Sequence, residues 1–193
     1  MTTGTKKSNT DQNEGKIYII ADTHFGDNNI RLYEGRPFPD TETMDREMIK
    51  RWNETVSEQD HVYHLGDFCS QGENRCRELL SQLKGHKYLL IGNHDLYLSP
   101  QKWCELGFET CYDLPVILKG FFILSHYPLY VNRSMPYANL YGHVHSSPTY
   151  RSVSSRSACV SVERIGYAPI LLEDLRDLML EEQEKEDVAA LDV

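Results

Sequence analysis

Five short clusters of histidine, aspartate and asparagine occur in order along the chain. Each follows a run of apolar, β-branched or aromatic residues of the kind that forms strands. In sequence order the clusters are Asp22-Thr23-His24, Gly66-Asp67, Gly92-Asn93-His94-Asp95, Ser125-His126 and Gly142-His143-Val144-His145. Imidazole nitrogen suits iron, zinc and nickel, whereas carboxylate and carbonyl oxygen suit manganese and magnesium. The clusters therefore predict a single rim that binds divalent metal ions.

The number of donors indicates more than one ion. A structural zinc ion takes four ligands, usually with cysteine among them. Here seven side chains are candidate ligands: Asp22, His24, Asp67, Asn93, His126, His143 and His145. Two ions about 4 Å apart that share one carboxylate would use such a set, and this arrangement serves phosphoryl hydrolysis.

The remaining sequence predicts the strands and helices that position these donors. Strands are expected over residues 17–20, 62–65, 88–91, 116–118, 121–124, 138–141 and 158–162. Helices are expected over residues 41–57, with Thr41 as the cap, over 74–83, and after Ser99-Pro100. Strands that first alternate with helices and then follow one another indicate an α/β fold with two packed sheets flanked by helices.

The ordered clusters resemble the signature of the calcineurin-like metallophosphoesterases, which reads D-x-H, G-D, G-N-H-[D/E], H and G-H-x-H. All five blocks are present between Asp22 and His145. The stretch that includes Arg36-Pro37-Phe38 is similar to a small single-domain bacterial and phage branch of that superfamily. The resemblance implies a four-layer α/β/β/α sandwich, in which two mixed sheets are flanked by helices and the metal loops lie at the strand ends.

The resemblance also implies how the seven donors divide between two ions. The first ion would be bound by Asp22, His24 and His145. The second would be bound by Asn93, His126 and His143, and Asp67 would bridge the pair. The donors admit manganese, iron, zinc or nickel, and we expect Mn²⁺, with the other three as alternatives.

The implied reaction is hydrolysis of a phosphate ester, with a phosphodiester favoured over a phosphomonoester. A hydroxide that bridges the two ions would attack phosphorus in line. His94 would act as general acid toward the leaving oxygen, and Asp95 would orient the His94 imidazole. Two alternatives remain: a nuclease that acts on DNA or RNA, and a non-catalytic scaffold with the same fold.

Substrate contacts are less strongly indicated than metal ligands. Asn28, Tyr127 and Arg133 follow the metal clusters closely and could contact a phosphate ester, including a nucleotide. Each could equally be an ordinary turn or rim residue. His64 lies inside an expected strand, so we interpret it as a packed residue or one that supports a ligand.

Composition limits the remaining functions. The formal net charge of −9 argues against a broad surface for duplex nucleic acid. The five cysteines lack C-x-x-C spacing and indicate reduced thiols of a cytoplasmic protein. The polar first fifteen residues lead us to expect no signal peptide, and no apolar run is long enough to span a membrane. We expect a disordered N-terminal extension over residues 1–15, one phosphoesterase domain over 16–175, and an acidic helix or tail over 176–193.

Overall fold

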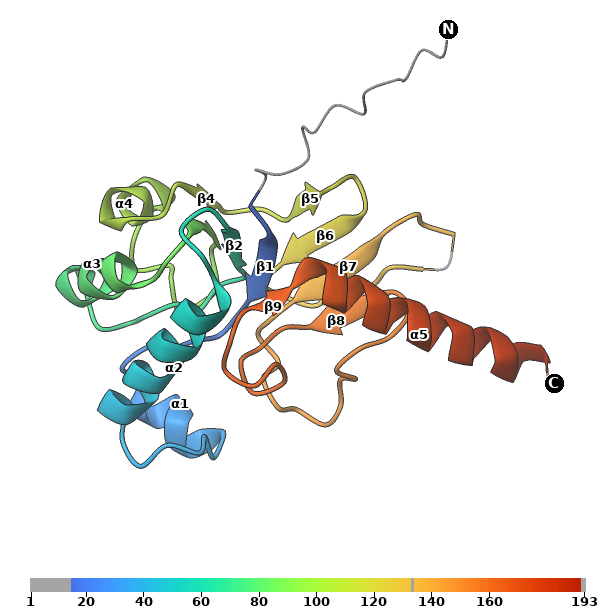
Figure 1. Ribbon diagram of the computed structural model, residues 1–193, viewed down its shortest axis with the longest axis horizontal. Coiled ribbons are helices and arrows are strands. Elements are labelled where there is room, and N and C mark those ends of the chain that lie inside the picture. The colour runs from blue at the N-terminus through green and yellow to red at the C-terminus, as the bar shows by residue number, and fades with distance from the viewer. Residues whose placement is uncertain (1–14, 133, 192–193) are drawn as a thin grey trace, which may run out of the picture.

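The computed structural model describes residues 15–132 and 134–191. The extension expected over residues 1–15 therefore lies outside the described residues, apart from Gly15. The described chain forms two β-sheets that pack against each other, with helices beside them (Figure 1). This confirms the prediction of two mixed sheets flanked by helices in an α/β fold.

The first sheet is parallel except at one edge. Its strand order is β4-β3-β2-β1-β9, and only β9 runs antiparallel to its neighbour. The bounds are β1 (Ile17–Ile20), β2 (His61–His64), β3 (His86–Leu90), β4 (Thr110–Tyr112) and β9 (Ile170–Leu171). Because parallel strands end at the same edge of a sheet, the loops that follow β1, β2 and β3 lie side by side.

The second sheet carries the two remaining clusters. Its order is β5-β6-β7-β8, with β5 antiparallel to β6 and the other pairs parallel. The bounds are β5 (Val116–Leu118), β6 (Phe122–Ser125), β7 (Ala138–Tyr141) and β8 (Ser157–Cys159). Two backbone hydrogen bonds join the sheets where β1 ends. Ala21 N–H donates to Val160 O at 2.9 Å, and Val162 N–H donates to Ala21 O at 3.1 Å. The rims of both sheets therefore meet beside the first cluster.

Helices cover the face of the first sheet that points away from the second sheet. These helices are α2 (Thr41–Thr55), α3 (Glu73–Gln82) and α4 (Pro100–Leu106), whereas the short helix α1 (Asn28–Tyr33) has no buried residue. Trp52 of α2, Leu79 of α3 and Trp103 of α4 are fully buried in one core with the strands. The α2 helix is capped by Asp40 and not by Thr41 as expected, because the Asp40 carboxylate accepts a hydrogen bond from Thr43 N–H at 2.7 Å.

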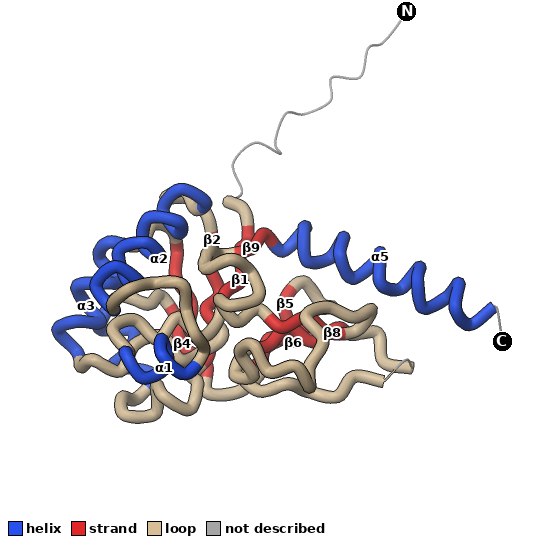
Figure 2. The backbone as a smooth tube through the Cα atoms, turned by 90° about the horizontal axis from the view of Figure 1, so that it is seen from below, coloured by secondary structure: helices blue, strands red, loops and turns tan. Residues whose placement is uncertain are grey.

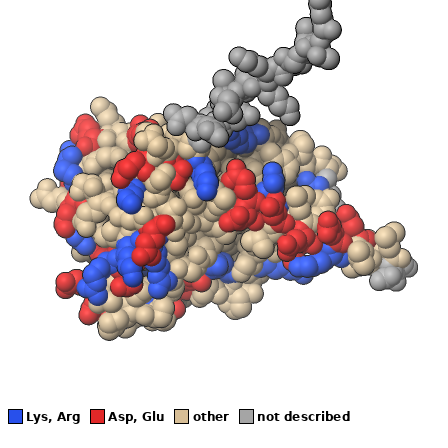
Figure 3. All heavy atoms as spheres, viewed as in Figure 1, with Lys and Arg blue, Asp and Glu red and all other residues tan. Residues whose placement is uncertain are grey.

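The last helix, α5 (Leu172–Leu191), lies on the other side of the molecule from α1 to α4 (Figure 2). Leu172, Leu175 and Met179 bury its first half in the core that the two sheets share. Beyond Met179 the helix is mostly exposed, and acidic side chains gather along it (Figure 3). Within the described ranges, the helices are too short or too polar to cross a membrane.

Candidate metal centre

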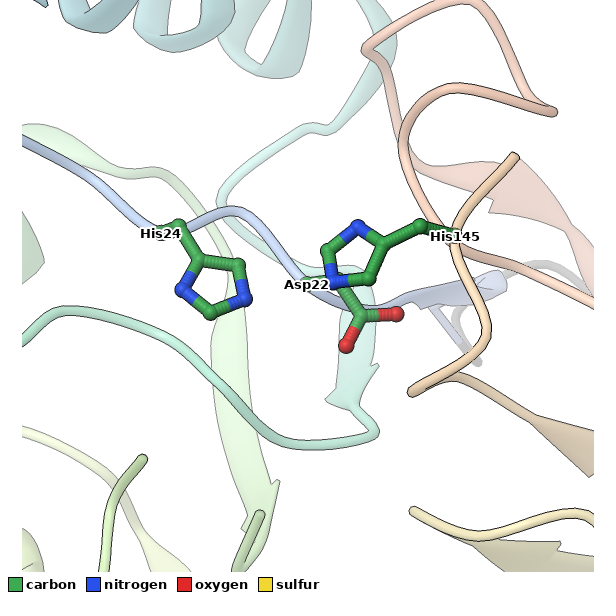
Figure 4. A group of neighbouring side chains, drawn as sticks. All are labelled: Asp22, His24 and His145. Carbon is green, nitrogen blue, oxygen red and sulfur yellow. The ribbon is translucent and has the colours of Figure 1, made fainter. Parts of the chain in front are cut away.

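Three groups of potential metal ligands occur among the described residues. Glu34, His145 and Glu163 form one that shares His145 with another group, and the other two contain the predicted ligands and lie where the strands of both sheets end. Of these two, the first group is Asp22, His24 and His145 (Figure 4), and the second is Asp67, His126 and His143. Within each group the candidate ligand atoms all lie within 4.8 Å of one another. The loops after β1 and β7 form the first group, and the loops after β2, β6 and β7 form the second. The fold thus brings together six residues that the sequence placed in four separate clusters.

Asp67 lies between the two groups. Its Oδ2 is 3.4 Å from His24 Nε2 of the first group and 3.5 Å from His126 Nε2 of the second. Burial would raise the pKa of Asp67, but the nearby His24 and His126 imidazoles outweigh it and hold the pKa below its usual value. An ionised carboxylate between two sets of donors is the arrangement that a shared metal ligand requires.

The seventh predicted ligand, Asn93, joins the second group. Its Oδ1 lies 2.9 Å from His126 Nε2 and 2.9 Å from His143 Nδ1. These three atoms therefore converge on one point at the strand ends. That all seven residues bind metal remains a prediction.

Backbone strain is concentrated at these residues. Asp22, His24, Asp67, His143 and His145 have φ values of 59°, 47°, 60°, 68° and 46°. Side chains larger than glycine are uncommon in this left-handed region, and each instance costs about 1–3 kcal/mol. Only two further non-glycine residues in the described ranges have positive φ, namely Lys119 and Tyr167. The fold therefore holds the predicted ligands in conformations that they would not adopt by themselves.

Two glycines make room for the ligand carboxylates. A Cβ added at Gly142 would lie 2.6 Å from Asp22 Oδ2, and one added at Gly92 would lie 2.3 Å from Asp67 Oδ1. Any side chain at either position would displace a predicted ligand. This close approach explains why glycine begins both the G-N-H-D and the G-H-x-H blocks.

Asp22 is fully buried and held by the opposite sheet. Its carboxylate accepts hydrogen bonds from His143 N–H at 2.9 and 3.0 Å and from Ser161 Oγ at 2.6 Å. Burial raises the pKa of Asp22 in the metal-free protein. A divalent ion would offset that unfavourable burial of charge.

The residues fit divalent ions in a further respect. His24 Nε2 is buried and has no hydrogen-bond partner among the described residues. A buried polar atom without a partner costs about 1–3 kcal/mol, so such atoms are rare in native folds. A metal ion would supply the missing partner, and the mixture of imidazole, carboxylate and amide donors suits a borderline divalent ion.

His94 lies at the exposed edge of the centre. Its backbone N–H donates to Asp67 Oδ1 at 2.8 Å, and its ring centroid is 5.1 Å from that of His24. The side chain is exposed, whereas His24 is buried. The His94 imidazole is thus next to the first group and accessible to a ligand that approaches from solvent.

Asp95 is placed differently from the sequence-based expectation that it orients His94. Its Oδ2 accepts hydrogen bonds from Asp67 N–H at 2.7 Å and Gly92 N–H at 2.9 Å, and its Oδ1 accepts one from Phe68 N–H at 3.0 Å. Burial is the main cause that raises the pKa of Asp95 to about 6. Because its oxygens face the backbone of the Asp67 loop, Asp95 fixes that loop and does not bind the His94 ring.

The three expected substrate contacts have different outcomes. Tyr127 is half exposed, and its ring centroid is 4.6 Å from that of His143. Asn28 is exposed at the start of α1, where its Oδ1 accepts hydrogen bonds from Arg31 Nε and Nη2 at 3.0 and 2.9 Å. Arg133 lies outside the described residues. Contact with substrate remains a prediction for all three.

Sequence reasoning missed the residues that support the first group. Glu163 Oε1 lies 3.1 Å from His145 Nδ1 and 2.7 Å from Arg36 Nη2, and both partners are buried. Arg36 stood in a recognisable R-P-F segment, but Glu163 lies after the last block and carried no signal. His64 is a packed residue, as expected: it is buried, and its Nε2 lies 2.9 Å from Thr23 Oγ1.

Comparison with known proteins identifies relatives across most of the chain. The family model described as calcineurin-like phosphoesterase matches residues 15–191. The uncharacterized protein MJ1445 of Methanocaldococcus jannaschii is 33% identical over 166 residues, which cover 82% of this chain and 88% of that protein. The gene 66 protein of Mycobacterium phage L5 is 34% identical over 82 residues, 40% of this chain and 39% of that protein. A crystal structure of a protein of unknown function, AQ665 from Aquifex aeolicus, aligns with a TM-score of 0.64 and 25% identity over 85% of this chain and 99% of that chain.

Proposed function

The chain belongs to the calcineurin-like phosphoesterase family, and on that premise we propose that it is a dinuclear enzyme that hydrolyses phosphodiesters in preference to phosphomonoesters. Metal-dependent hydrolysis of phosphate esters is the reaction of the family. The observation that carries the proposal is the convergence of Asp67 Oδ2 with donor atoms from both ligand groups. Asp22, His24 and His145 would hold one ion, and Asn93, His126 and His143 the other. Mn²⁺ is the first ion to test, because it accepts both oxygen and imidazole donors.

Bound ions would lower the pKa of a water molecule between them and offset the negative charge that develops on the phosphoryl oxygens. The protein's own residues would supply orientation and a proton. In this proposal the His94 imidazole donates a proton to the leaving oxygen, since its ring lies beside His24 and is open to solvent. Asp95 accepts hydrogen bonds from the backbone N–H groups of Asp67 and Gly92 and so fixes the two loops relative to each other.

The preference for diesters rests on access to the centre. His94 is exposed beside His24 of the first ligand group, and Tyr127 is half exposed beside His143 of the second. A phosphate that carries two ester groups can therefore approach with one group near His94 and the other along the Tyr127 ring. Such a ring offers stacking to a base or an aryl group, which is worth about 1–3 kcal/mol per base.

The proposal is tested by turnover of bis-p-nitrophenyl phosphate and p-nitrophenyl phosphate with Mn²⁺-loaded protein. We expect hydrolysis of both, with the higher kcat/KM for the diester, and its loss after chelation. Asp67→Asn should abolish turnover, and His94→Ala should lower kcat by about 10²–10⁴-fold. His86→Ala is the matched control, because the His86 side chain pairs with Glu109 and not with any predicted ligand.

Two outcomes would contradict the proposal in different ways. Protein that binds Mn²⁺ but leaves both esters intact would be a non-catalytic scaffold. Protein that degrades single-stranded or duplex nucleic acid much faster than the small diester would be a nuclease. If monoester turnover exceeds diester turnover, the family reaction stands and the diester preference is wrong.

A further inference from the structure

A buried arginine ties the backbone of the first ligand loop to a distant carboxylate. Arg36 Nη2 donates to Asp22 O at 2.8 Å, and Arg36 Nη1 donates to Thr23 O at 2.7 Å. The same guanidinium donates through Nε and Nη2 to Glu163 Oε1, at 2.9 and 2.7 Å. The Arg36 side chain is fully buried, so these contacts use donors that water cannot satisfy.

Glu163 continues this network to a predicted ligand. Its Oε1 lies 3.1 Å from His145 Nδ1. A carboxylate can only accept at this position, so Nδ1 of His145 carries a proton and the lone pair is on Nε2. Nε2 is therefore the atom that is free to bind an ion with Asp22 and His24. Arg36 and Glu163 thus link both loops that form the first group.

The second ligand group is supported differently. His126 Nδ1 lies 2.8 Å from the backbone carbonyl of Leu65, a neutral acceptor. His143 Nδ1 faces Asn93 Oδ1 and belongs to the donor atoms themselves. Among the described residues, a carboxylate that is not itself a predicted ligand accepts from a ligand imidazole only at His145. Such a carboxylate partner fixes the ring and makes the other nitrogen a better donor, and its loss costs about 10–100-fold in metal affinity.

The Arg36–Glu163 ion pair is not an efficient source of folding stability. Two buried charges pay a large desolvation cost that their attraction often fails to repay. Glu163 Oε2 is also buried and has no hydrogen-bond partner among the described residues. Because the pair contacts both ligand loops, it is better explained by its effect on those loops.

We propose that Arg36 and Glu163 are positioning residues for the first ion, and that they make this position the tighter of the two. The proposal rests on the proposed dinuclear centre. It assigns no catalytic step to either residue, because they act through Asp22 and His145. It also predicts an order of loading, with the position at Asp22, His24 and His145 filled first.

The test is calorimetric titration of metal-free protein with Mn²⁺, without reference to activity. Wild type should bind two ions in two resolved steps. Glu163→Gln keeps the shape of the side chain and an acceptor for His145, but removes its charge. We expect the tighter step to weaken by about 10–100-fold, and the weaker step to stay within about threefold of its wild-type value.

Asp60→Asn is the matched control. Asp60 is a buried carboxylate whose hydrogen bonds go to Ser57 and to Lys16 N–H, away from the ligand loops. Its substitution should leave both binding steps unchanged. Arg36→Lys is a second test of the pair, because lysine cannot reach Glu163 and both backbone carbonyls at once. The double variant should bind no more weakly than the worse single variant, since the two residues act as one unit.

The outcomes separate the two proposals. If wild type binds two ions and hydrolyses diesters, but Glu163→Gln and Arg36→Lys bind both ions as wild type does, the positioning role is wrong and the phosphoesterase stands. If the variants weaken both steps equally and the metal-free proteins lose thermal stability to match, the pair is only structural and the inference is overturned. If wild type binds fewer than two ions, both the proposed dinuclear centre and the positioning role are wrong.

Discussion

Asp95→Asn tests whether this carboxylate fixes the Asp67 loop or orients His94. In the structure its two oxygens accept three backbone N–H groups, from Asp67, Phe68 and Gly92. Asparagine has one oxygen and one NH₂ group at the same place. If the amide oxygen keeps the two contacts with Asp67 and Gly92, the NH₂ group must face Phe68 N–H, which is also a donor.

The expected cost follows from that count. One buried N–H without a partner costs about 1–3 kcal/mol. The two contacts that remain lose the strength that charge gives to a hydrogen bond, which is roughly a factor of two. Together these effects should lower the free energy of unfolding by about 2–4 kcal/mol, within a total of about 5–15 kcal/mol for a typical domain. For a chain of this size that corresponds to a fall in Tm of about 5–15 °C.

The assay is urea denaturation of metal-free protein, followed by circular dichroism, for wild type, Asp95→Asn and Asp113→Asn. Asp113 is exposed, so the same change there should stay within about 0.5 kcal/mol. Because the Asp67 loop is displaced, Asp95→Asn should also bind Mn²⁺ more weakly. An unfolding free energy equal to that of wild type, together with a lower kcat, would refute the structural argument. That result would favour the role in orienting His94 that the sequence suggested.

Three further predictions concern pH, packing and metal. Burial lowers the pKa of His64 to about 3, whereas histidine in an unfolded chain has a pKa of about 6.5. As the pH falls from 6.5 toward 3, the unfolded state therefore takes up a proton before the folded state does, and the folded state loses stability. Urea denaturation should therefore show wild type losing about 2 kcal/mol more than His64→Gln between pH 7.5 and pH 5, and equal losses would exclude this contribution. Gly142→Ala places a Cβ 2.6 Å from Ala21 Cβ and Asp22 Oδ2, so it should cost about 1–3 kcal/mol in urea denaturation and weaken Mn²⁺ binding in calorimetry. Removal of both ions by a chelator should lower Tm by about 10–20 °C if each ion was present at about 100 times its Kd, and a similar fall in Asp67→Asn would show that the ions bind elsewhere.

Much of the fold followed from patterns within the sequence. The strands β1, β5 and β7 begin and end where the apolar runs predicted, and α2 and α3 lie within one or two residues of their expected bounds. The sequence analysis did not predict α1, β4 or β9. Other errors occurred at element ends, as for the cap at Asp40 and for β8, which is shorter than the expected strand over 158–162. The first and last residues of a helix or strand depend on single hydrogen bonds, which the spacing of apolar residues does not predict.

The candidate site was likewise predictable from the sequence only in part. Residue types and their order after strands were enough to predict seven donors at one rim, because parallel strands bring their ends to one edge. Their division between two positions was implied by the family resemblance. The tertiary structure alone decided what supports those donors. Asp95 adjoins His94 in sequence, yet its side chain turns to the backbone of Asp67 and Phe68.

Arg36 and Glu163 are 127 positions apart and meet only because β1 and the segment after β8 pair at the joined rims. A ligand must have a particular chemistry and follow a strand, so the sequence displays it. A supporting residue needs only to reach the ligand in space, and many sequence positions can satisfy that condition. The predicted ligands could therefore be read from the sequence, and the contacts that hold them in place were determined by the packing of two sheets.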